Sequence, residues 1–426
     1  MATVFWLLCG LVAYVYVGYP LLLHVWARVW PAPVLGDSSA DLEPPVSFVI
    51  AARNEGRRLA HRMDNIRDLD YPAAKRQVIV VSDGSTDNTL EILAGMGSCV
   101  EAIALDTGGK ARALNAGVAA ARHDIIVFAD MRQGFAPDAL RALVAPFRDP
   151  RVGAVSGELV LDGEARDRRA DERRERMERR ALSDRRGVRR RTHGQRNGKR
   201  RWSLRRAIFE STIGDGVGLY WRYEKQIRRD ESAAASLVGA TGAIYAMRRS
   251  LWQPLPPDTI LDDVLTPMRC VMAGYRVVFE ERACAFDRTA SSANAEGRRK
   301  LRTLAGNYQL FWLEPALLLP WRNPAWIQFV SHKAGRLLVP YALPLLFVFS
   351  LLLARDAAVY AAAFIAQCAF YALAAYGFWL EDTSRPAAVP VAAINRLARI
   401  ALMFLVMNTS AVAGLVALLT RQKVWR

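Results

Sequence analysis

Apolar residues dominate both ends of the chain, and a long polar region separates them. Residues 2 to 27 hold no acid or base except His24, and three more apolar stretches lie at 337–353, 357–380 and 398–419. A helix needs roughly 20 such residues to cross a bilayer. The first stretch lacks the positively charged start of a cleaved signal peptide. We therefore predict an N-terminal transmembrane helix within residues 1–30 and about three C-terminal transmembrane helices within 335–420. Long buried helices of a soluble protein are the alternative.

Four short runs of Val, Ile and Ala recur through the first half of the polar region. They are "VSFVIAA" (46–52), "QVIVVSD" (77–83), "CVEAIAL" (99–105) and "DIIVFAD" (124–130), and helical patterns at 89–96 and 111–121 lie between them. Continuous apolar runs that alternate with helices are typical of a parallel sheet covered on both faces. The pattern predicts an α/β domain with a Rossmann-like, mostly parallel sheet.

Polar residues follow each of these predicted strands. They are Arg53, Asn54 and Glu55 after the first, Asp83, Ser85 and Asp87 after the second, Lys110 after the third and Asp130 after the fourth. Ligands of open α/β sheets bind beyond the carboxyl ends of the strands. A single acid there can be a helix N-cap, and Asp87 is read equally well in that way. The whole set predicts a nucleotide with phosphates, with acids for ribose, base and metal and Lys110 for the diphosphate.

The formal charge of +17 is concentrated in one segment. Residues 164–206 contain 19 Lys/Arg and 7 Asp/Glu, and the surrounding Arg-rich insert, 163–207, has almost no residues that could build a core. We interpret it as a solvated insert, with attraction to anionic membrane lipids as a second interpretation. No nucleic-acid partner is expected, since aromatic residues do not interleave the arginines. The five scattered cysteines indicate a reducing compartment without a thiolate metal site.

Seven motifs between residues 46 and about 303 occur in the order found in one known family. They are "FVIAARNEG", "VVSDGSTDNT", "GGKARALNAG", "FADMR", "GATGAIYAMRR", "ILDD" and "RKLRT". In these motifs the chain resembles the membrane-bound inverting glycosyltransferases of family 2, which include cellulose, hyaluronan and poly-N-acetylglucosamine synthases. The resemblance implies a GT-A fold, a nucleotide-diphosphate sugar and a divalent metal. It assigns sugar-nucleotide binding to Ala51, Arg53, Glu55, Asp83, Ser85, Lys110 and Asp130.

One departure from the family pattern concerns the metal. Asp130 matches the first acid of the family's DxD motif, whose oxygens bind Mg²⁺ or Mn²⁺, but Arg132 stands where the second acid is expected. A guanidinium cannot ligate a metal, although it can pair with Asp130 or with a phosphate oxygen. Either Asp130 and another group hold the metal, or cationic residues share its work. An ordinary surface pair of Asp130 and Arg132 is the structural alternative.

A second acid pair, Asp262 and Asp263, precedes Thr266 and Pro267, which we read as the N-cap and first residue of a helix. The resemblance makes Asp263 the base that takes the proton of the acceptor hydroxyl, and Asp262 its neighbour that orients it or contacts the acceptor. Helix capping alone is the alternative.

The remaining motifs point to the diphosphate and the acceptor. Arg299 and Arg302 match the family's (Q/R)xxRW motif, where they would stabilise the departing diphosphate, but Thr303 replaces its tryptophan. Trp312 or the aromatic residues at 220–224 could replace it, although ordinary packing explains both. Thr241 and Gly242 suit a backbone that approaches a sugar, and a tight turn explains them equally well.

These observations predict a GT-A domain at 40–305, an interfacial helical region at 306–334 with a helix at 307–321, and a multi-pass protein of the cell (inner) membrane. The positive-inside tendency places the domain in the cytoplasm. Four crossings would leave the basic residues 421–426 outside, so one stretch does not cross or an interfacial helix is miscounted. We expect transfer from a nucleotide-diphosphate sugar, UDP-linked, to a growing polysaccharide. Transfer of a single sugar to a membrane lipid and a non-catalytic membrane scaffold or transporter are the alternatives, and any accessory subunit is unknown.

Overall fold

The computed structural model describes residues 1–35, 43–161, 222–287, 293–382 and 389–420. The Arg-rich insert predicted at 163–207 lies outside these residues. Eight strands form one mixed sheet in the order β3-β2-β1-β4-β7-β6-β8-β5. The strands are β1 Val46–Ala52, β2 Arg76–Asp83, β3 Glu101–Leu105, β4 Ile125–Ala129, β5 Gly134–Phe135, β6 Val152–Leu161, β7 Ile244–Arg248 and β8 Arg276–Asp287.

The direction of each strand decides which loops share an edge of the sheet. Strands β1, β2, β3 and β4 run parallel, β7 is antiparallel to both β4 and β6, and β8 is parallel to β6. The carboxyl ends of β1–β4, β6 and β8 therefore lie at one edge, which we call the carboxyl edge. Because β7 runs the opposite way, the loop that precedes it reaches the same edge.

Helices cover both faces of the sheet because its strands are apolar on both sides. In β1, Val46, Phe48 and Ile50 face a core shared with α3, α4 and α6, whereas Val49 faces a second core shared with α5, α9 and α10. These helices are α3 Gly56–Arg67, α4 Thr89–Gly95, α5 Lys110–Ala120, α6 Ala139–Val144, α9 Asp262–Met272 and α10 Ala293–Leu313. The expected α/β fold with a mostly parallel sheet is confirmed. A further helix, for which we use the name helix 222–234, follows the insert.

Four helical segments are long and apolar enough to cross a membrane: Ala2–Val29, Trp326–Leu353, Ala358–Leu380 and Ala393–Leu419. The first joins α1 Ala2–Ala13, a π-helical turn Tyr14–Gly18 and α2 Tyr19–Val29. The second joins α11 Trp326–Phe329, a π-helical turn Val330–Ala334 and α12 Gly335–Leu353, so it begins well before the expected residue 337. The others belong to α13 Ala358–Asp382 and α14 Val389–Leu419.

The helix expected at 307–321 is wrong in its extent. Residues 307–313 are the last part of α10, which ends at Leu313, and a short 3₁₀ turn, Pro315–Leu318, follows. Pro315 has no N–H and restricts the backbone of Glu314, whose φ of −144° is not helical. A single helix therefore cannot continue through this point.

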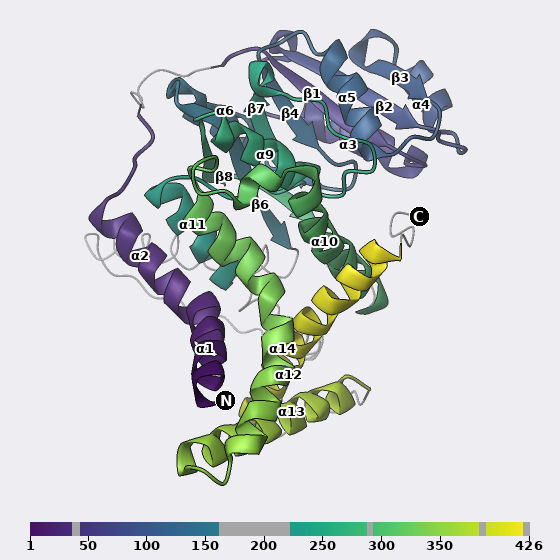
Figure 1. Cartoon of the computed structure of the whole chain (residues 1–426). Helices are drawn as coiled ribbons and strands as arrows, with labels where there is room; N and C mark the ends of the chain where they lie inside the picture. Colours follow the sequence, from purple (N-terminus) through teal and green to yellow (C-terminus); the bar gives the residue numbers. More distant parts are fainter. Residues whose placement is uncertain (36–42, 162–221, 288–292, 383–388, 421–426) are drawn as a thin grey trace, which may run out of the picture.

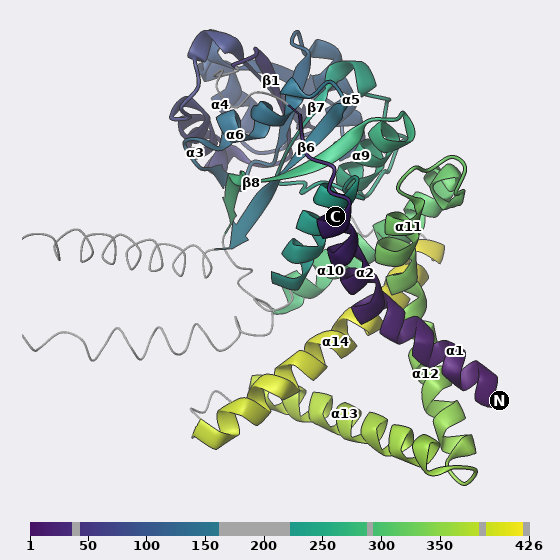
Figure 2. The same ribbon diagram turned by 90° about the vertical axis from the view of Figure 1, so that its left-hand side faces the viewer.

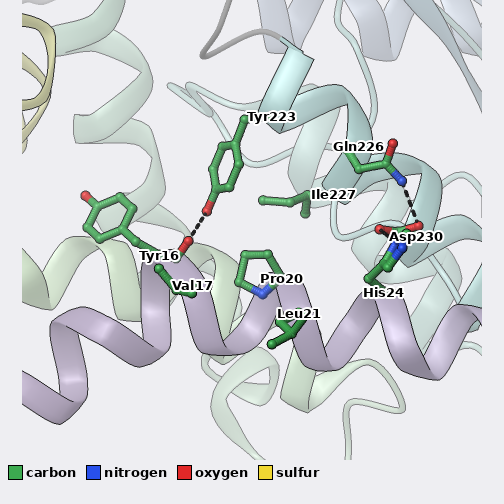
Figure 3. A pocket seen from close by; sticks show the side chains of 9 residues that line it. All are labelled: Tyr16, Val17, Pro20, Leu21, His24, Tyr223, Gln226, Ile227 and Asp230. Atoms are coloured by element: carbon green, nitrogen blue, oxygen red, sulfur yellow. Dashed lines mark hydrogen bonds and ion pairs between the residues drawn. The ribbon is translucent and has the colours of Figure 1, made fainter. Parts of the chain in front are cut away.

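The arrangement of α12, α13 and α14 bears on the number of crossings. Figures 1 and 2 show α12 leading away from the domain, α13 lying across its far end, and α14 returning toward the domain. The return is close, because a Cβ added to Gly414 of α14 would lie 2.9 Å from the backbone N of Ala305 in α10. In this arrangement α14 ends on the same side as the domain.

Candidate active site

Asp83, the last residue of β2, fixes the glycine turn that follows β3. Its Oδ1 accepts hydrogen bonds from the backbone N–H groups of Gly108 at 2.6 Å and Gly109 at 3.0 Å, and its Oδ2 accepts from Gly109 at 3.0 Å. Gly109 has φ +89°, a conformation that glycine adopts without a steric cost. The guanidinium of Arg53 lies 3.9 Å from Asp83 Oδ2. The structure thus brings Arg53, Asp83 and the turn before Lys110 together at the carboxyl edge.

The loops after β1 and β2 bind each other. Ser85 Oγ accepts from the N–H of Asn54 at 3.1 Å, and Asn54 Oδ1 accepts from the N–H of Thr86 at 2.7 Å. The N–H of Glu55 donates to Thr89 Oγ1 at 3.0 Å. Ser85 and Glu55 therefore shape this part of the edge. Ala51 lies within β1, where it pairs with Val81 of β2.

Asp87 has a capping role. Its carboxylate accepts from the N–H of Gly56, the first residue of α3, at 3.1 Å and from the N–H of Thr89, the first residue of α4, at 3.0 Å. The Thr89 hydroxyl also donates to Asp87, and this side-chain hydrogen bond contributes most to a lowered pKa of Asp87. Asp87 thus satisfies the first N–H group of two helices, although the N-cap residues themselves are Asn88 for α4 and Glu55 for α3.

Lys110, the first residue of α5, lies between two predicted site acids. Its Nζ is 3.1 Å from Asp262 Oδ1 and 3.5 Å from Asp130 Oδ1. Burial on its own would lower the pKa of Lys110, but the charges of Asp130, Asp262 and Asp263 outweigh it and raise the pKa above the ordinary value. Lys110 is therefore a permanent cation that joins the end of β4 to the start of α9. Its side chain is 42% exposed, so a bound anion can reach it.

Our reading of Thr266 and Pro267 as the start of a helix is wrong, and the actual arrangement fixes Asp263. Helix α9 begins at Asp262, and Pro267 lies inside it. Because proline has no N–H, Pro267 leaves the carbonyl of Asp263, four residues earlier, without its helical donor. That carbonyl accepts from the N–H of Ala240 at 2.7 Å instead. The hydrogen bond from Ala240 thus attaches the 239–242 loop to the helix turn that carries Asp262 and Asp263.

The docked loop lies directly against the Asp263 carboxylate. A Cβ added to Gly242 would lie 2.7 Å from Asp263 Oδ2, so only glycine fits without displacing the acid. Burial, and next the charge of Asp262, raise the pKa of Asp263 to about 6, against the opposing charges of Lys110 and Lys333. A carboxylate with a pKa of about 6 is still ionised at pH 7 and is a stronger base than an ordinary aspartate.

Arg132 does not pair with Asp130. Its Nη2 lies 2.8 Å from Asp287 Oδ2, and Gln133 Nε2 donates to the same oxygen at 3.0 Å. Asp287 is the last residue of β8, its side chain is 2% exposed, and it lies at the carboxyl edge. The pairing of Arg132 with Asp130 that we considered is therefore wrong, and Arg132 joins the ends of β4 and β8.

The donor groups near Asp130 bear on a divalent metal. Among the residues that the structure describes, no three His, Cys, Asp or Glu side chains gather in a way that could hold a metal. The Asp130 side chain is 42% exposed at the carboxyl edge. Mg²⁺ commonly binds proteins through only one or two carboxylates, and substrate phosphates complete its shell. Asp130 fits such a site as a single protein ligand.

Several residues near the acids escaped sequence analysis. Arg228, in helix 222–234, donates to Thr241 Oγ1 at 2.5 Å and to Ser156 Oγ at 2.7 Å, and Ser156 Oγ also accepts from the Thr241 N–H at 2.9 Å. Burial lowers the pKa of Arg228. Tyr245 in β7 is fully buried, and its hydroxyl has no hydrogen-bond partner among the described atoms. Arg228 belongs to no recognised motif. Asp287 is an acid at the end of a strand, as Asp83 and Asp130 are, so the same criterion could have selected it.

The two predicted diphosphate arginines lie on α10. Arg302 is exposed and has no ion pair within the described part of the chain, and the side chain of Arg299 lies outside it. The helix itself is tied to the acid loop, because Gln309 accepts from the N–H of Ile260 at 2.9 Å and a Cβ on Gly306 would lie 2.5 Å from Leu261. The roles of both arginines stay predictions. Trp312, a suggested substitute for the family tryptophan, is 69% exposed.

Comparisons with known proteins identify a family for part of the chain. Residues 47–212 match the family described as Glycosyl transferase family 2. Poly-beta-1,6-N-acetyl-D-glucosamine synthase of Staphylococcus aureus (strain COL) is 31% identical over 125 residues, which cover 28% of this chain and 30% of the relative. Beta-monoglucosyldiacylglycerol synthase of Synechocystis sp. is 32% identical over 141 residues, which cover 32% of this chain and 29% of the relative. The chain thus spans less than a third of the length of these relatives.

Nearly the whole chain also aligns with a solved structure. It is the mannosyltransferase PcManGT from Pyrobaculum calidifontis in complex with GDP-Man and Mn²⁺, with a TM-score of 0.63, 21% identity, and coverage of 98% of this chain and 99% of that chain. This likeness shows the fold, including the apolar helices at both ends. Residues 47–212 therefore carry a glycosyl transferase family 2 domain, as the motifs predict, and the fold is of the GT-A type.

Proposed function

We propose that the protein transfers a sugar from a nucleotide-diphosphate sugar to an acceptor hydroxyl, with inversion at the anomeric carbon. The observation that carries the proposal is the gathering of Lys110, Asp130, Asp262 and Asp263 at one edge of the sheet, with Lys110 within 3.5 Å of two of the acids. Asp83 and Arg53 lie at the same edge, where the nucleoside would bind. Relatives from the same family are named as sugar-transferring synthases.

Each residue has a chemical task in this proposal. Asp263, with its raised pKa, removes the proton of the acceptor hydroxyl as the oxygen attacks the anomeric carbon and the nucleoside diphosphate leaves. Lys110 carries the positive charge that the leaving diphosphate needs, and it can exchange its contact with Asp262 for a phosphate oxygen. Asp262 holds the ammonium in place until the substrate arrives.

A divalent cation would bind at Asp130, where it would neutralise charge on the diphosphate. The structural relative was solved with Mn²⁺ and GDP-Man, so both GDP- and UDP-linked sugars are candidate donors. Arg132 is held by Asp287 through Nη2, and its side chain is 45% exposed, so its other N–H groups could bind a phosphate oxygen but not a metal. The metal would therefore have one protein carboxylate ligand, and Lys110 would help it to neutralise the negative charge of the diphosphate.

The acceptor we propose is a growing polysaccharide, as for the Staphylococcus relative. A single transfer to a membrane lipid is the second candidate, and the helical arrangement favours it. With α13 lying across the far ends of α12 and α14, few helices remain to enclose a glycan channel. The protein would lie in the cell membrane with the domain and the end of α14 on the cytoplasmic side.

Incubation of membranes with a panel of radiolabelled UDP- and GDP-linked sugars tests the proposal. We expect label to enter a product from at least one donor, with loss of that signal in Asp263→Asn. Sizing the product distinguishes the two acceptors, because a polymer gives long chains and a lipid acceptor gives one discrete extractable species. Equal incorporation by the wild type and the variant would contradict the proposal.

A further inference from the structure

A groove lies between the first membrane helix and helix 222–234, away from the acid cluster. It has a volume of about 380 Å³ and is lined by Tyr16, Val17, Pro20, Leu21, His24, Tyr223, Gln226, Ile227 and Asp230. Four of these residues, Val17, Pro20, Leu21 and Ile227, are apolar. The volume is in the usual range for a small-molecule site.

A proline opens one end of this groove. Pro20 has no N–H, so the carbonyl of Tyr16, four residues earlier, lacks its helical donor. The hydroxyl of Tyr223 donates to that carbonyl at 2.9 Å and thereby fixes helix 222–234 beside the π-helical turn Tyr14–Gly18. The Tyr223 hydroxyl thus supplies a donor that Pro20 cannot, and it joins helix 222–234 to the first apolar segment at one end of the groove.

The other end of the groove is polar. Asp230 Oδ2 lies 3.0 Å from His24 Nδ1, and Asp230 Oδ1 accepts from Gln226 Nε2 at 3.0 Å. Because a carboxylate only accepts, the proton of a neutral His24 sits on Nδ1, and Nε2 keeps a lone pair. No described residue bonds His24 Nε2, so it is free to accept a hydroxyl hydrogen.

The position of the groove indicates what fills it. Val17 and Leu21 are 64% and 61% exposed on a segment long and apolar enough to cross a membrane, so acyl chains surround them in a bilayer. His24, at the polar end, precedes Trp30 by six residues, about 9 Å along a helix, and Trp30 is 71% exposed just after the segment, where aromatic residues mark the headgroup level. The eight residues from Val17 to His24 span about 10 Å of helix, which suits part of an acyl chain.

The charge at the polar end selects the head of the lipid. Asp230 carries the only carboxylate among the lining residues, no Lys or Arg lines the groove, and a carboxylate repels a phosphate. We propose that the groove binds one acyl chain of a glycerolipid with an uncharged head, such as diacylglycerol, whose hydroxyl donates to His24 Nε2.

This lipid is not the sugar acceptor. Tyr223, Gln226, Ile227 and Asp230 form one face of helix 222–234, whereas Arg228 lies on the neighbouring face and reaches Thr241 beside Asp263. The bound lipid instead holds the helix that carries Arg228 against the membrane helix. Lipid binding does not depend on sugar transfer, so each proposal can fail without the other.

Photolabelling of the full chain in detergent micelles tests this inference. The probes are diacylglycerol and phosphatidic acid, each with a diazirine on one acyl chain, and labelled peptides are mapped by mass spectrometry. We expect diacylglycerol adducts in residues 16–24 and 223–230. In Leu21→Trp, labelling should fall about tenfold because the indole fills the groove. Leu22→Trp is the matched control, because Leu22 is equally exposed, at 61%, but does not line the groove.

Three further results decide the outcome. Val17→Trp, a second filling variant, should lose labelling as Leu21→Trp does, and His24→Phe should weaken labelling by diacylglycerol. Phosphatidic acid should label the groove about tenfold less than diacylglycerol, because Asp230 repels its phosphate. Equal labelling of the filling variants and Leu22→Trp, adducts spread evenly over the four apolar segments, or equal labelling by the two probes would overturn the inference.

Discussion

The ammonium of Lys110 lies 3.1 Å from a carboxylate oxygen of Asp262. This ion pair joins the start of α5, which follows β3, to the start of α9, which lies far later in the chain. Its acid partner is buried, with a side chain that is only 6% exposed, while the lysine is 42% exposed. A buried acid with a half-exposed cation can release that cation to an incoming anion, provided that the acid finds another partner. Tyr245, with its unpartnered buried hydroxyl and its proximity to Asp262, is a candidate for that partner.

Lys110→Met should reduce kcat/KM for the sugar nucleotide by about 10²–10³-fold, because a preorganised charge at the diphosphate is lost. Arg112→Met is the matched control: Arg112 lies on the same helix and contacts only the carbonyl of Asp106, at 3.4 Å, among the described hydrogen bonds. Steady-state kinetics with a labelled donor measures both. Equal activity of the Lys110→Met and Arg112→Met enzymes would show that Lys110 does not stabilise the diphosphate.

The rate of transfer should depend on the ionisation of Asp263. Its pKa is raised to about 6, so the carboxylate is mostly protonated below that pH and cannot accept the proton of the acceptor. We expect kcat/KM to fall about tenfold per pH unit below about pH 6 and to be level between pH 7 and 8. A pH–rate profile measures this. A level profile down to pH 4.5 would argue against a carboxylate base with this pKa.

Asp263→Asn should make the protein more stable at neutral pH, although it abolishes transfer. A folded-state pKa raised from 3.8 to about 6 means that the folded protein binds the proton more tightly, so stability falls as pH rises through this window. Asparagine removes the penalty, which is on the order of 1–3 kcal/mol at pH 7 and about half as large at pH 5. Thermal unfolding of both proteins in the same detergent at the two pH values measures the difference. A variant less stable than the wild type at pH 7 would contradict the assignment.

Gly242→Ala should reduce kcat about 10–100-fold and leave donor KM nearly unchanged, because the new methyl displaces the Asp263 carboxylate. Gly95→Ala in α4 is the control, since a Cβ there meets no atom within 4 Å. Donor kinetics on the two variants gives the comparison. The prediction fails if both alanine variants retain full activity.

Arg132→Met should cost about 2 kcal/mol of stability, because it leaves the buried Asp287 carboxylate with the Gln133 amide as its remaining described partner at this oxygen. Arg132→Met combined with Asp287→Asn should recover about half of that loss, since the buried charge that lost its guanidinium partner is removed. Arg132→Asp restores the spacing of two acids but should not increase stimulation by Mn²⁺, because it places a second carboxylate beside Asp287. Denaturation of the single and double variants, with Mn²⁺ titrations of activity, tests these effects. Stronger Mn²⁺ dependence in Arg132→Asp would show that residue 132 faces the metal.

The carboxyl edge was predictable where a strand and its polar ending are adjacent in sequence. Asp83 and Asp130 directly follow apolar runs, so the parallel sheet alone brings them to one edge. Residues that reach the site from other elements were not predictable in this way. Arg228 lies on a helix that follows the insert in the sequence. Arg132 pairs with Asp287, which is 155 positions further along the chain, and not with the nearby Asp130. Pro267 was predicted to be the first residue of α9, but it lies inside the helix. There it frees the carbonyl of Asp263 to bind the N–H of Ala240 in a distant loop, and no local sequence pattern reveals such a contact.

The most direct test of the central claim measures donor binding and sugar transfer on the same Asp263→Asn protein. The account predicts that equilibrium binding of the labelled sugar nucleotide stays within about threefold of the wild type, because Asp263 does not bind the nucleotide, while transfer falls at least about 10³-fold. Retention of transfer, or loss of donor binding together with transfer in a folded protein, would contradict the assignment of Asp263 as the base.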